Sequence, residues 1–321
     1  MIVTLTANPS LDRTVPLDRG LTRGEVHRAG AVTVEPGGKG INVARVVHYA
    51  GHPLRAVLPA DPGDPILRGL DELMLPYRTV PLLGQVRTNL TLTEPDGTTT
   101  KINEPGPTPS PATVEALARL LVLEAERADW VVLSGSLPPG VPASWYADLV
   151  QALRPWGCRI AVDTSDAPLL ALAAAFPAAA PDLIKPNSEE LAQLTGADPE
   201  ALEAAAAAGD PSATVLAARS LVADGVGAVL VTLGAAGAVL VTAAGAWQAI
   251  PPPIVVRSTV GAGDSAVAGY VLAETRGLPP ADRLRLAVAY GSAAASLAGT
   301  QLPKPEQLHT EQVKVIALPA T

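Results

Sequence analysis

Short β-branched runs alternate with amphipathic stretches along most of this 321-residue chain, and this alternation constrains the fold more than any other feature. Buried strands are expected at 2–6, 130–133, 159–162, 183–185 and 228–233. Helices are expected near 40–50, 112–127, 143–154, 188–195, 214–224, 263–275 and 280–298, and the alanine-rich stretch 197–213 is a surface helix or a loop. Such alternation predicts βαβ units and an α/β fold with a mostly parallel sheet, covered by helices on both faces. Because no repeat or long linker divides the chain, we expect a single domain over 1–321.

The region 85–103 departs from this alternation. Apolar and polar residues alternate there around Pro95-Asp96-Gly97, which is typical of a three-residue hairpin loop and places Asn89 opposite Asn103. Since the side-chain period of a strand is two, one face of the hairpin carries Arg87, Asn89, Lys101 and Asn103. This face is either simply solvated or holds a phosphate and hydroxyl groups. We expect the hairpin and the segment 12–35 to form a small β-sheet lid.

Composition excludes several classes of protein. The net charge is −8 without a basic block, and aromatic residues make up 3%, so neither a nucleic-acid surface nor an anionic-membrane surface is expected. No apolar run approaches the ~20 residues that span a bilayer, and the first residues do not resemble a targeting signal. Cys158 is the only cysteine and the four histidines are scattered, which argues against a metal cluster of these residues. We expect a cytoplasmic enzyme whose metal arrives with its substrate.

The strongest local motif is the turn 258–265, Ser-Thr-Val-Gly-Ala-Gly-Asp-Ser, which is followed by a predicted helix. Glycines let backbone N–H groups converge, and a helix N-terminus adds positive potential, so the turn suits a phosphoryl group. Asp264 is then placed to accept a proton from a substrate hydroxyl, as a kinase requires. The alternative interpretation is a glycine turn with an N-capping aspartate.

A second glycine-rich turn, 35–45, opens the helix expected near 40–50. Gly37 and Gly38 permit close approach of a ligand to the backbone, and Lys39 and Asn42 offer hydrogen-bond donors. The turn is not a Walker A loop, because the spacing of its glycines differs and Gly40 stands where Ser or Thr is required. No GxGxxG motif follows the first strand, which weakens a dehydrogenase interpretation.

Two further segments follow predicted strands. The turn 232–237 is a weak motif that could wrap a nucleotide. In the segment 185–190, Asn187 and Glu190 are three residues apart, which is typical of a helix-capping pair. The functional alternative is that they organise Mg²⁺ through water molecules.

Together these motifs resemble the PfkB-type branch of the ribokinase-like carbohydrate kinases, almost from end to end. The segments that carry the resemblance are NPSLD at 8–12, GGKGINVAR at 37–45, RTN at 87–89, INEPGP at 102–107, SGSLPPGV at 134–141, KPNSEE at 185–190, TLGAAG at 232–237 and STVGAGDS at 258–265. The resemblance implies a Rossmann-like three-layer α/β/α sandwich with a small β-sheet lid, often shared in homodimers. It also implies that ATP is the phosphate donor, with Mg²⁺.

The resemblance also implies roles for single residues. Gly261, Ala262 and Gly263 would form an anion hole, with Asp264 as the catalytic base. Asp12 and Asn42 would bind sugar hydroxyls, while Lys39, Arg87 and either Lys101 or Arg28 would hold the phosphate already on the sugar. The other residues expected on the sugar side are Gly37, Gly38 and Asn103. On the ATP side the resemblance points to Lys185, Asn187, Thr232, Gly234, Gly237 and Thr259, with Glu190 acting on Mg²⁺ through water.

Within the family the chain resembles the hexose-phosphate kinases. The segment 24–28 and the GGKG motif favour a 1-phosphofructokinase, which phosphorylates fructose 1-phosphate, whereas the segment 57–65 is more similar to the minor type of 6-phosphofructokinase. A tagatose-6-phosphate kinase is a third possibility within the family. A sugar-phosphate sensor without catalysis is an alternative of another class, although a sensor has no need for Asp264. A dehydrogenase is the alternative with least support.

Overall fold

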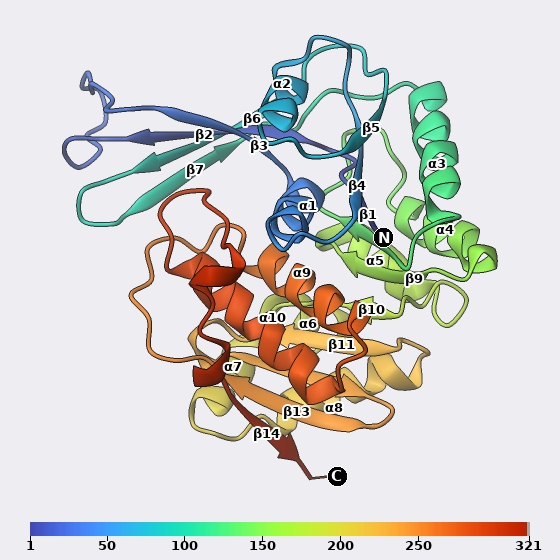
Figure 1. The fold of residues 1–321 in the computed structure, drawn as a ribbon. Helices are drawn as coiled ribbons and strands as arrows, with labels where there is room; N and C mark the ends of the chain where they lie inside the picture. The colour runs from blue at the N-terminus through green and yellow to red at the C-terminus, as the bar shows by residue number, and fades with distance from the viewer. Residues whose placement is uncertain (320–321) are drawn as a thin grey trace.

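Ten strands form the central sheet of the computed structural model, which describes residues 1–319 (Figure 1). Their order across the sheet is β14-β13-β12-β11-β10-β9-β8-β1-β4-β5. All neighbouring strands from β11 to β5 in this order pair in parallel. The pairs β11–β12, β12–β13 and β13–β14 are antiparallel. Their bounds are β1 Ile2–Leu5, β4 Leu54–Pro59, β5 Tyr77–Val80, β8 Trp130–Ser134, β9 Arg159–Asp163, β10 Leu183–Ile184, β11 Ala228–Thr232, β12 Ala238–Thr242, β13 Gly245–Ile250 and β14 Lys314–Leu318.

Helices cover both faces of this sheet. One face is packed by α1 Lys39–Tyr49, α2 Pro65–Glu72, α9 Ala262–Thr275 and α10 Pro280–Ala295. The other face is packed by α3 Pro111–Ala125, α4 Trp145–Leu153, α5 Asp166–Ala174, α6 Ser188–Thr195, α7 Pro199–Ala207 and α8 Ser212–Ala223. Short 3₁₀ helices lie at Arg154–Trp156, Gly234–Ala236, Pro305–Gln307 and Thr310–Gln312. The predicted three-layer α/β/α class is confirmed.

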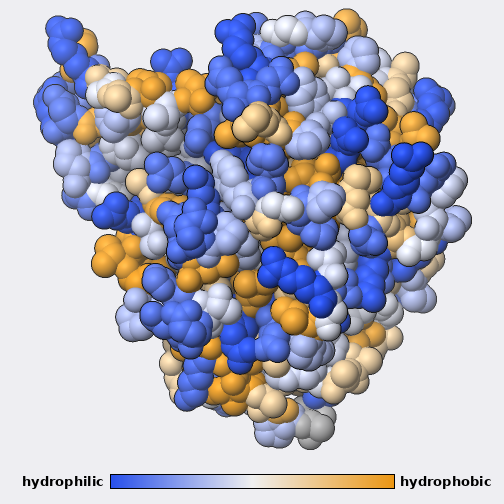
Figure 2. All heavy atoms as spheres, viewed as in Figure 1, coloured by the Kyte–Doolittle hydropathy of each residue, from blue (hydrophilic) through white to orange (hydrophobic). Residues whose placement is uncertain are grey.

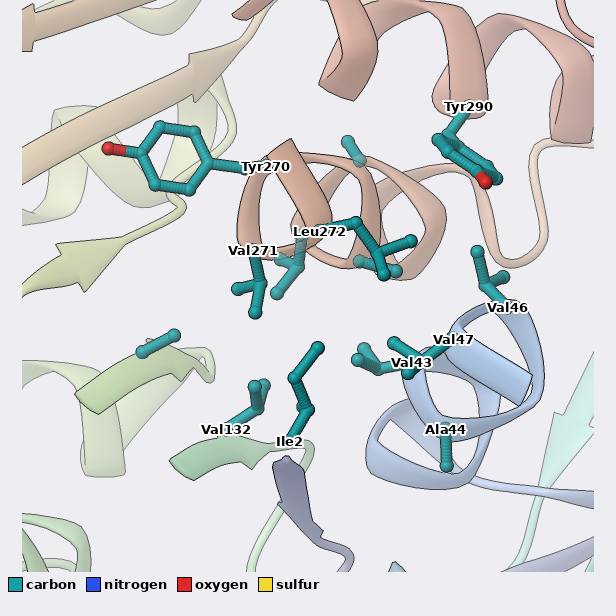
Figure 3. Packing of buried hydrophobic residues seen from close by; sticks show 14 of the residues in the cluster. Ile2, Val43, Ala44, Val46, Val47, Val132, Tyr270, Val271, Leu272 and Tyr290 are labelled. Atoms are coloured by element: carbon teal, nitrogen blue, oxygen red, sulfur yellow. The ribbon is translucent and has the colours of Figure 1, made fainter. Parts of the chain in front are cut away.

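The core consists of two apolar layers, one on each face of the sheet. Because successive strand residues point to opposite faces, Ile2 contributes to one layer and Val3 to the other. Figure 3 shows Ile2 and Val132 of the sheet pointing toward Val43 of α1 and Val271 of α9. These side chains are fully buried, and each contributes about 1.5–3 kcal/mol of transfer free energy. This packing holds α1 and α9, which begin at the two predicted glycine turns, against the same strands.

A second sheet of four strands projects from this body (Figure 1). Its order is β3 (Thr33–Gly37), β2 (Ser10–Pro16), β6 (Arg87–Thr93) and β7 (Thr99–Asn103). Asn89 lies opposite Asn103, which confirms the predicted hairpin register. Asp12 of β2 lies opposite both Glu35 and Asn89, so these side chains share one face of the small sheet.

Several elements differ from the sequence-based expectations. The strands β12, β13 and β14 extend the sheet with antiparallel pairs that were not predicted, whereas the stretch 197–213 contains helix α7, one of its two predicted alternatives. The segment 57–65 forms the end of β4 and the start of α2. There the carboxylate of Asp64 accepts hydrogen bonds from the backbone N–H groups of Ile66 at 2.9 Å and Val86 at 3.0 Å. This segment therefore anchors the chain just before β6.

The surface mixes hydrophilic and hydrophobic residues over most of the view in Figure 2. Among the helices of residues 1–319, none is long and apolar enough to cross a membrane. The carboxyl ends of the parallel strands meet at one edge of the main sheet, where ligands bind in open α/β folds. The predicted motifs that follow β1, β8, β10 and β11 all leave the sheet at this edge.

Candidate active site

The turn before α9 places a buried carboxylate at a helix N-terminus. Gly261 is the N-cap residue and has a left-handed backbone with φ of 74°, which glycine adopts without strain. Asp264 lies in the first turn of α9 and is 6% exposed. Within residues 1–319, the backbone N–H groups of Gly263 and Asp264 have no hydrogen-bond acceptor. Unpaired amides at a helix N-terminus favour an anion, so the turn suits a phosphoryl group.

Asp264 is joined to the other glycine turn through Asn42. The Nδ2 atom of Asn42, in the first turn of α1, donates to Oδ2 of Asp264 at 2.8 Å. Burial raises the pKa of Asp264 to about 6, and the negative charge of Asp163 adds to this shift. The hydrogen bond from Asn42 and the cations Lys39 and Lys185 act in the opposite direction. A carboxylate with a pKa near neutrality is suited to accept a proton from a hydroxyl.

Two lysines converge on a second carboxylate, Asp163, at the end of β9. Its Oδ1 atom lies 3.0 Å from Nζ of Lys39 and 3.3 Å from Nζ of Lys185. Although burial opposes it, Lys185 and Lys39 hold the pKa of Asp163 below its usual range. Burial likewise disfavours the charged form of Lys39, but Asp163, Asp264 and Glu190 outweigh this effect and raise its pKa. The site therefore contains two ammonium groups and two carboxylates in a largely buried space.

Sequence reasoning missed Asp163. The strand predicted at 159–162 ends one residue before it, and β9 runs to Asp163 itself. A charged residue directly after a buried strand, at the carboxyl edge of a parallel sheet, is the signal that would have identified it. Its partners Lys39 and Lys185 were both predicted, from motifs 146 residues apart.

Asp12 belongs to a hydrogen-bonded group on the small sheet. Nδ2 of Asn89 donates to Oδ1 of Asp12 and to Oγ of Ser10, both at 3.0 Å, and Ser10 Oγ donates to the same Asp12 oxygen at 2.7 Å. A Cβ atom at Gly37 would lie 2.2 Å from Oδ2 of Asp12, so only glycine fits beside this carboxylate. Gly38, with φ of 104°, is the N-cap residue of α1. Asn89 was predicted as one of the polar residues on this hairpin face, whereas Ser10 was not predicted as a site residue.

Arg87 lies at the start of β6, where the small sheet meets the body. Its guanidinium donates to the carbonyl oxygen of Glu104 at 3.1 Å and to Ser136 Oγ at 3.5 Å. Ser136 also accepts from Asn8 Nδ2 at 3.5 Å. This cluster joins the motifs that begin at residues 8, 87, 102 and 134.

The other predicted lid residues lie apart from these buried contacts. Lys101 and Asn103 stand on the outermost strand β7 with exposed side chains, and Arg28 is exposed between β2 and β3. In the part of the chain that the structure describes, none of these three side chains makes a hydrogen bond or an ion pair. Their role in phosphate binding stays a prediction.

The predicted nucleotide side lies at the ends of β10 and β11. Asn187 and Glu190 form a capping box at α6: Glu190 N–H donates to Asn187 Oδ1 at 2.7 Å, and Asn187 N–H donates to Glu190 Oε2 at 2.9 Å. The helix-capping pair, which was the alternative to a Mg²⁺ site at these two residues, is thus present. Thr232 pairs with Asn187 through a parallel bridge. Gly234 begins the 3₁₀ turn that follows Thr232.

Two more residues complete this side of the site. A Cβ atom at Gly237 would lie 2.0 Å from the carbonyl oxygen of Ala249, so this glycine serves close packing of the turn against β13. Thr259 is exposed just before the anion-binding turn. Lys185 connects the predicted nucleotide side with the anion-binding turn, because its Nζ lies 3.3 Å from the position of a Cβ atom on Gly263.

The donor set fits a phosphate-bearing ligand. Two ammonium groups, a guanidinium and a helix N-terminus converge at one edge of the sheet, and anions are held by such groups. No group of three or more His, Cys, Asp or Glu side chains within residues 1–319 is arranged to hold a metal ion. Oδ2 of Asp163 is buried without a hydrogen-bond partner, so the site retains an acceptor.

Comparison with known proteins agrees with this chemistry. The model of the pfkB family carbohydrate kinases matches residues 6–307. The 1-phosphofructokinase of Rhodobacter capsulatus is 40% identical over 311 residues, which are 96% of this chain and 94% of that protein. The ATP-dependent 6-phosphofructokinase isozyme 2 of Escherichia coli is 34% identical over 305 residues, or 94% of each chain.

The fold is also similar to a solved structure. Phosphofructokinase-2 from Escherichia coli, in complex with substrates and products, has a TM-score of 0.86 to this chain, with 33% identity over 97% of both chains. The family match extends over most of the chain, and the buried carboxylate, cations and helix N-terminus suit a phosphoryl group. The chain therefore belongs to the pfkB family of carbohydrate kinases and is a phosphotransferase that acts on a hydroxyl group.

Proposed function

We propose that this kinase transfers the γ-phosphoryl group of ATP to fructose 1-phosphate and forms fructose 1,6-bisphosphate. The observation that carries the chemistry is the buried pair of Asn42 and Asp264 at the N-terminus of α9, beside two lysines. The choice of sugar is supported by relatives named 1-phosphofructokinase, which are 33–40% identical over most of the chain.

In the proposed mechanism Asp264 accepts the proton of the attacking hydroxyl. Of the predicted anion hole, the N–H groups of Gly261 and Gly263, together with that of Asp264, stabilise the negative charge of the phosphoryl group, because the N–H of Ala262 donates to the carbonyl oxygen of Thr259 at 3.4 Å. Lys185 lies against the same turn. Asn42 orients the carboxylate of Asp264 through its hydrogen bond. General-base assistance of this kind is worth about 10² to 10⁴ in rate.

The sugar phosphate is proposed to bind between the small sheet and α1. Asp12 and Asn42 would bind its hydroxyls, with Gly37 and Gly38 giving space for the sugar. Its phosphate would be held by Lys39 and Arg87, with Lys101 and Asn103 of the outer strand closing over it. The pairing of two cations supports this role, because charge-assisted hydrogen bonds hold phosphate more strongly than neutral ones.

ATP is proposed to lie along the ends of β10 and β11, against Lys185, Asn187, Thr232, Gly234, Gly237 and Thr259. Mg²⁺ bound with ATP supplies positive charge that stabilises the phosphoryl oxygens. Glu190, with Asn187, would hold this ion through water molecules, which suits Mg²⁺ because it keeps much of its hydration.

Fructose 6-phosphate is a second candidate substrate, because a 6-phosphofructokinase of the same family is 34% identical to this chain. A coupled assay of ADP release with fructose 1-phosphate, fructose 6-phosphate, tagatose 6-phosphate and free fructose separates the candidates. We expect the highest kcat/KM with fructose 1-phosphate and the lowest with free fructose. Sugar-phosphate binding without ADP release would instead support a sensor.

We also propose a homodimer formed through the small sheet. On its face opposite to Asp12, Arg13 stands between Val34 and Leu90, and Leu90 pairs with Ile102; Val34 and Ile102 are 53% and 55% exposed. Ile102→Lys is expected to convert a dimer to a monomer in light scattering after gel filtration. A wild-type monomer would contradict this proposal. The cytoplasmic location expected from the sequence stays a prediction.

A further inference from the structure

Asp163 holds two cations that come from opposite sides of the candidate active site. Lys39 is the first residue of α1 and follows the sugar-side glycine turn, whereas Lys185 follows β10 and lies against Gly263 of the anion-binding turn. Both ammonium groups contact the same carboxylate oxygen, at 3.0 and 3.3 Å. We propose that Asp163 is a positioning residue for phosphoryl transfer, which fixes these two cations on either side of the transferred group. This inference rests on the proposed function of the site.

The backbone of Asp163 is held rigidly. Its carbonyl oxygen accepts from Gly135 N–H at 2.9 Å. The carbonyl oxygen of Gly135 accepts in turn from the hydroxyl groups of Tyr146 and Thr164, both at 3.0 Å and both buried. A carboxylate anchored to two neighbouring strands and to α4 can set the spacing of two flexible lysine side chains. Lysine is otherwise a mobile point charge on a long stem.

The charges explain why a carboxylate is needed at this position. Two ammonium groups that contact one atom repel each other strongly in a poorly solvated space, and the shared negative charge offsets this repulsion. The side chain of Lys39 is 35% exposed, so it is available to a ligand while Asp163 holds it. Asp163 itself is 1% exposed. The arrangement therefore holds one positive charge on the sugar side and one at the anion-binding turn, where both can contact phosphate groups of the bound ligands.

A purely stabilising ion pair is the alternative, and two observations weigh against it. Buried ion pairs add little net stability unless every polar atom is satisfied. Oδ2 of Asp163 is buried and has no hydrogen-bond partner within residues 1–319. Incomplete satisfaction of this kind is expected at a functional site rather than in a structural contact. The negative charge of Asp163 also opposes ionisation of the proposed base, Asp264.

The test is Asp163→Asn, which keeps the shape of the side chain and removes its charge. We expect kcat to fall about 10²-fold, the scale found when one preorganised electrostatic partner is removed. The acidic limb of the pH profile of kcat should move to lower pH, because Asp264 loses a like charge and keeps both lysines. A purely structural role would lower the melting temperature without this fall in kcat.

Asp182→Asn is the matched control. Asp182 directly precedes β10, at the opposite edge of the sheet, and accepts from Ile160 N–H at 2.9 Å. We expect this variant to lose some stability and to keep both kcat and the acidic limb. Lys39→Met, alone and with Asp163→Asn, adds a double-mutant cycle. If Asp163 acts through Lys39, its replacement costs several-fold less in kcat in the Lys39→Met background.

Failure of the proposed function can be distinguished from failure of the inference about Asp163. A wild-type protein that releases no ADP with any of the sugar phosphates removes the proposed function, and the inference with it. An active wild-type protein whose Asp163→Asn variant keeps kcat and the acidic limb overturns the inference alone. Additive effects in the double-mutant cycle would also contradict it.

Discussion

Asn42 on α1 donates a hydrogen bond of 2.8 Å to Asp264 on α9, across 222 positions of the sequence. The two helices begin at the two glycine turns and pack against the same apolar layer. This contact joins the proposed sugar side to the anion-binding turn. The proposed base is therefore oriented by a residue that also lies where the sugar is expected, so binding and proton transfer share one hydrogen bond.

Asp264→Asn should abolish most turnover. The amide keeps an oxygen that accepts from Asn42 but cannot take a proton at neutral pH, so kcat is expected to fall about 10² to 10⁴-fold. Steady-state kinetics with fructose 1-phosphate and calorimetric titration of ATP provide the measurements. ATP affinity should change less than about threefold. Turnover near the wild-type level would exclude Asp264 as the base.

Asn42→Ala should move the acidic limb of the kcat profile to higher pH. The hydrogen bond from Asn42 stabilises the charged carboxylate, and its loss lets burial raise the pKa of Asp264 further above about 6. The direction is opposite to that expected for Asp163→Asn, so the two variants serve as controls for each other. A shift to lower pH in Asn42→Ala would contradict the assignment of this limb to Asp264.

The ionised carboxylate of Asp264 should also lower the free energy of unfolding above about pH 6. Its pKa rises from an ordinary value of about 3.9 to about 6 in the folded protein, so the folded state binds this proton more tightly than the unfolded state. The associated stability is present below pH 4 and is lost as the pH rises through 6. Asp264→Asn lacks this titration, and we expect it to be more stable than the wild type at pH 8 by on the order of 1–3 kcal/mol.

Urea unfolding of both proteins at pH 5 and pH 8 measures this effect. The difference in free energy of unfolding should shrink toward pH 5, where part of the wild-type carboxyl is already protonated. An equal difference at both pH values would show that it does not arise from ionisation of Asp264.

The sequence allowed the parallel strands and the motif residues to be predicted, because their signals are local. Short β-branched runs identified β1, β8, β9 and β11, and turn chemistry identified the register of Asn89 and Asn103. The antiparallel strand β14 is also a short β-branched run, but its partner β13 ends 64 residues earlier, so only tertiary pairing places it in the sheet. Asp163 has a local signal, its place at the end of a predicted strand, but that signal does not indicate its partners. Its meaning depends on two lysines that only the fold brings together.

Gly37→Ala should weaken sugar binding and leave ATP binding intact. The new Cβ atom would lie 2.2 Å from Oδ2 of Asp12, so the carboxylate or strand β3 must move. We expect KM for the sugar phosphate to rise at least about 10-fold, the cost of one displaced hydrogen-bonding group of about 1.5 kcal/mol. Gly30→Ala is the matched control in the small sheet region, because its Cβ atom would meet nothing closer than 3.4 Å. Equal KM values for the two variants would remove Asp12 from the sugar site.

Arg87→Leu should discriminate between a phosphorylated and a free sugar. If Arg87 holds the substrate's phosphate, its loss removes a charge-assisted hydrogen bond worth about 1.5–3 kcal/mol, so KM for fructose 1-phosphate rises about 10- to 150-fold. The rate with free fructose should stay unchanged, because that substrate has no phosphate to lose. Arg127→Leu is the matched control: Arg127 lies between α3 and β8, at the opposite edge of the main sheet, and its side chain is exposed. A parallel loss of activity on both sugars in Arg87→Leu would instead assign Arg87 to the packing of Glu104 and Ser136, the groups it contacts in the structure.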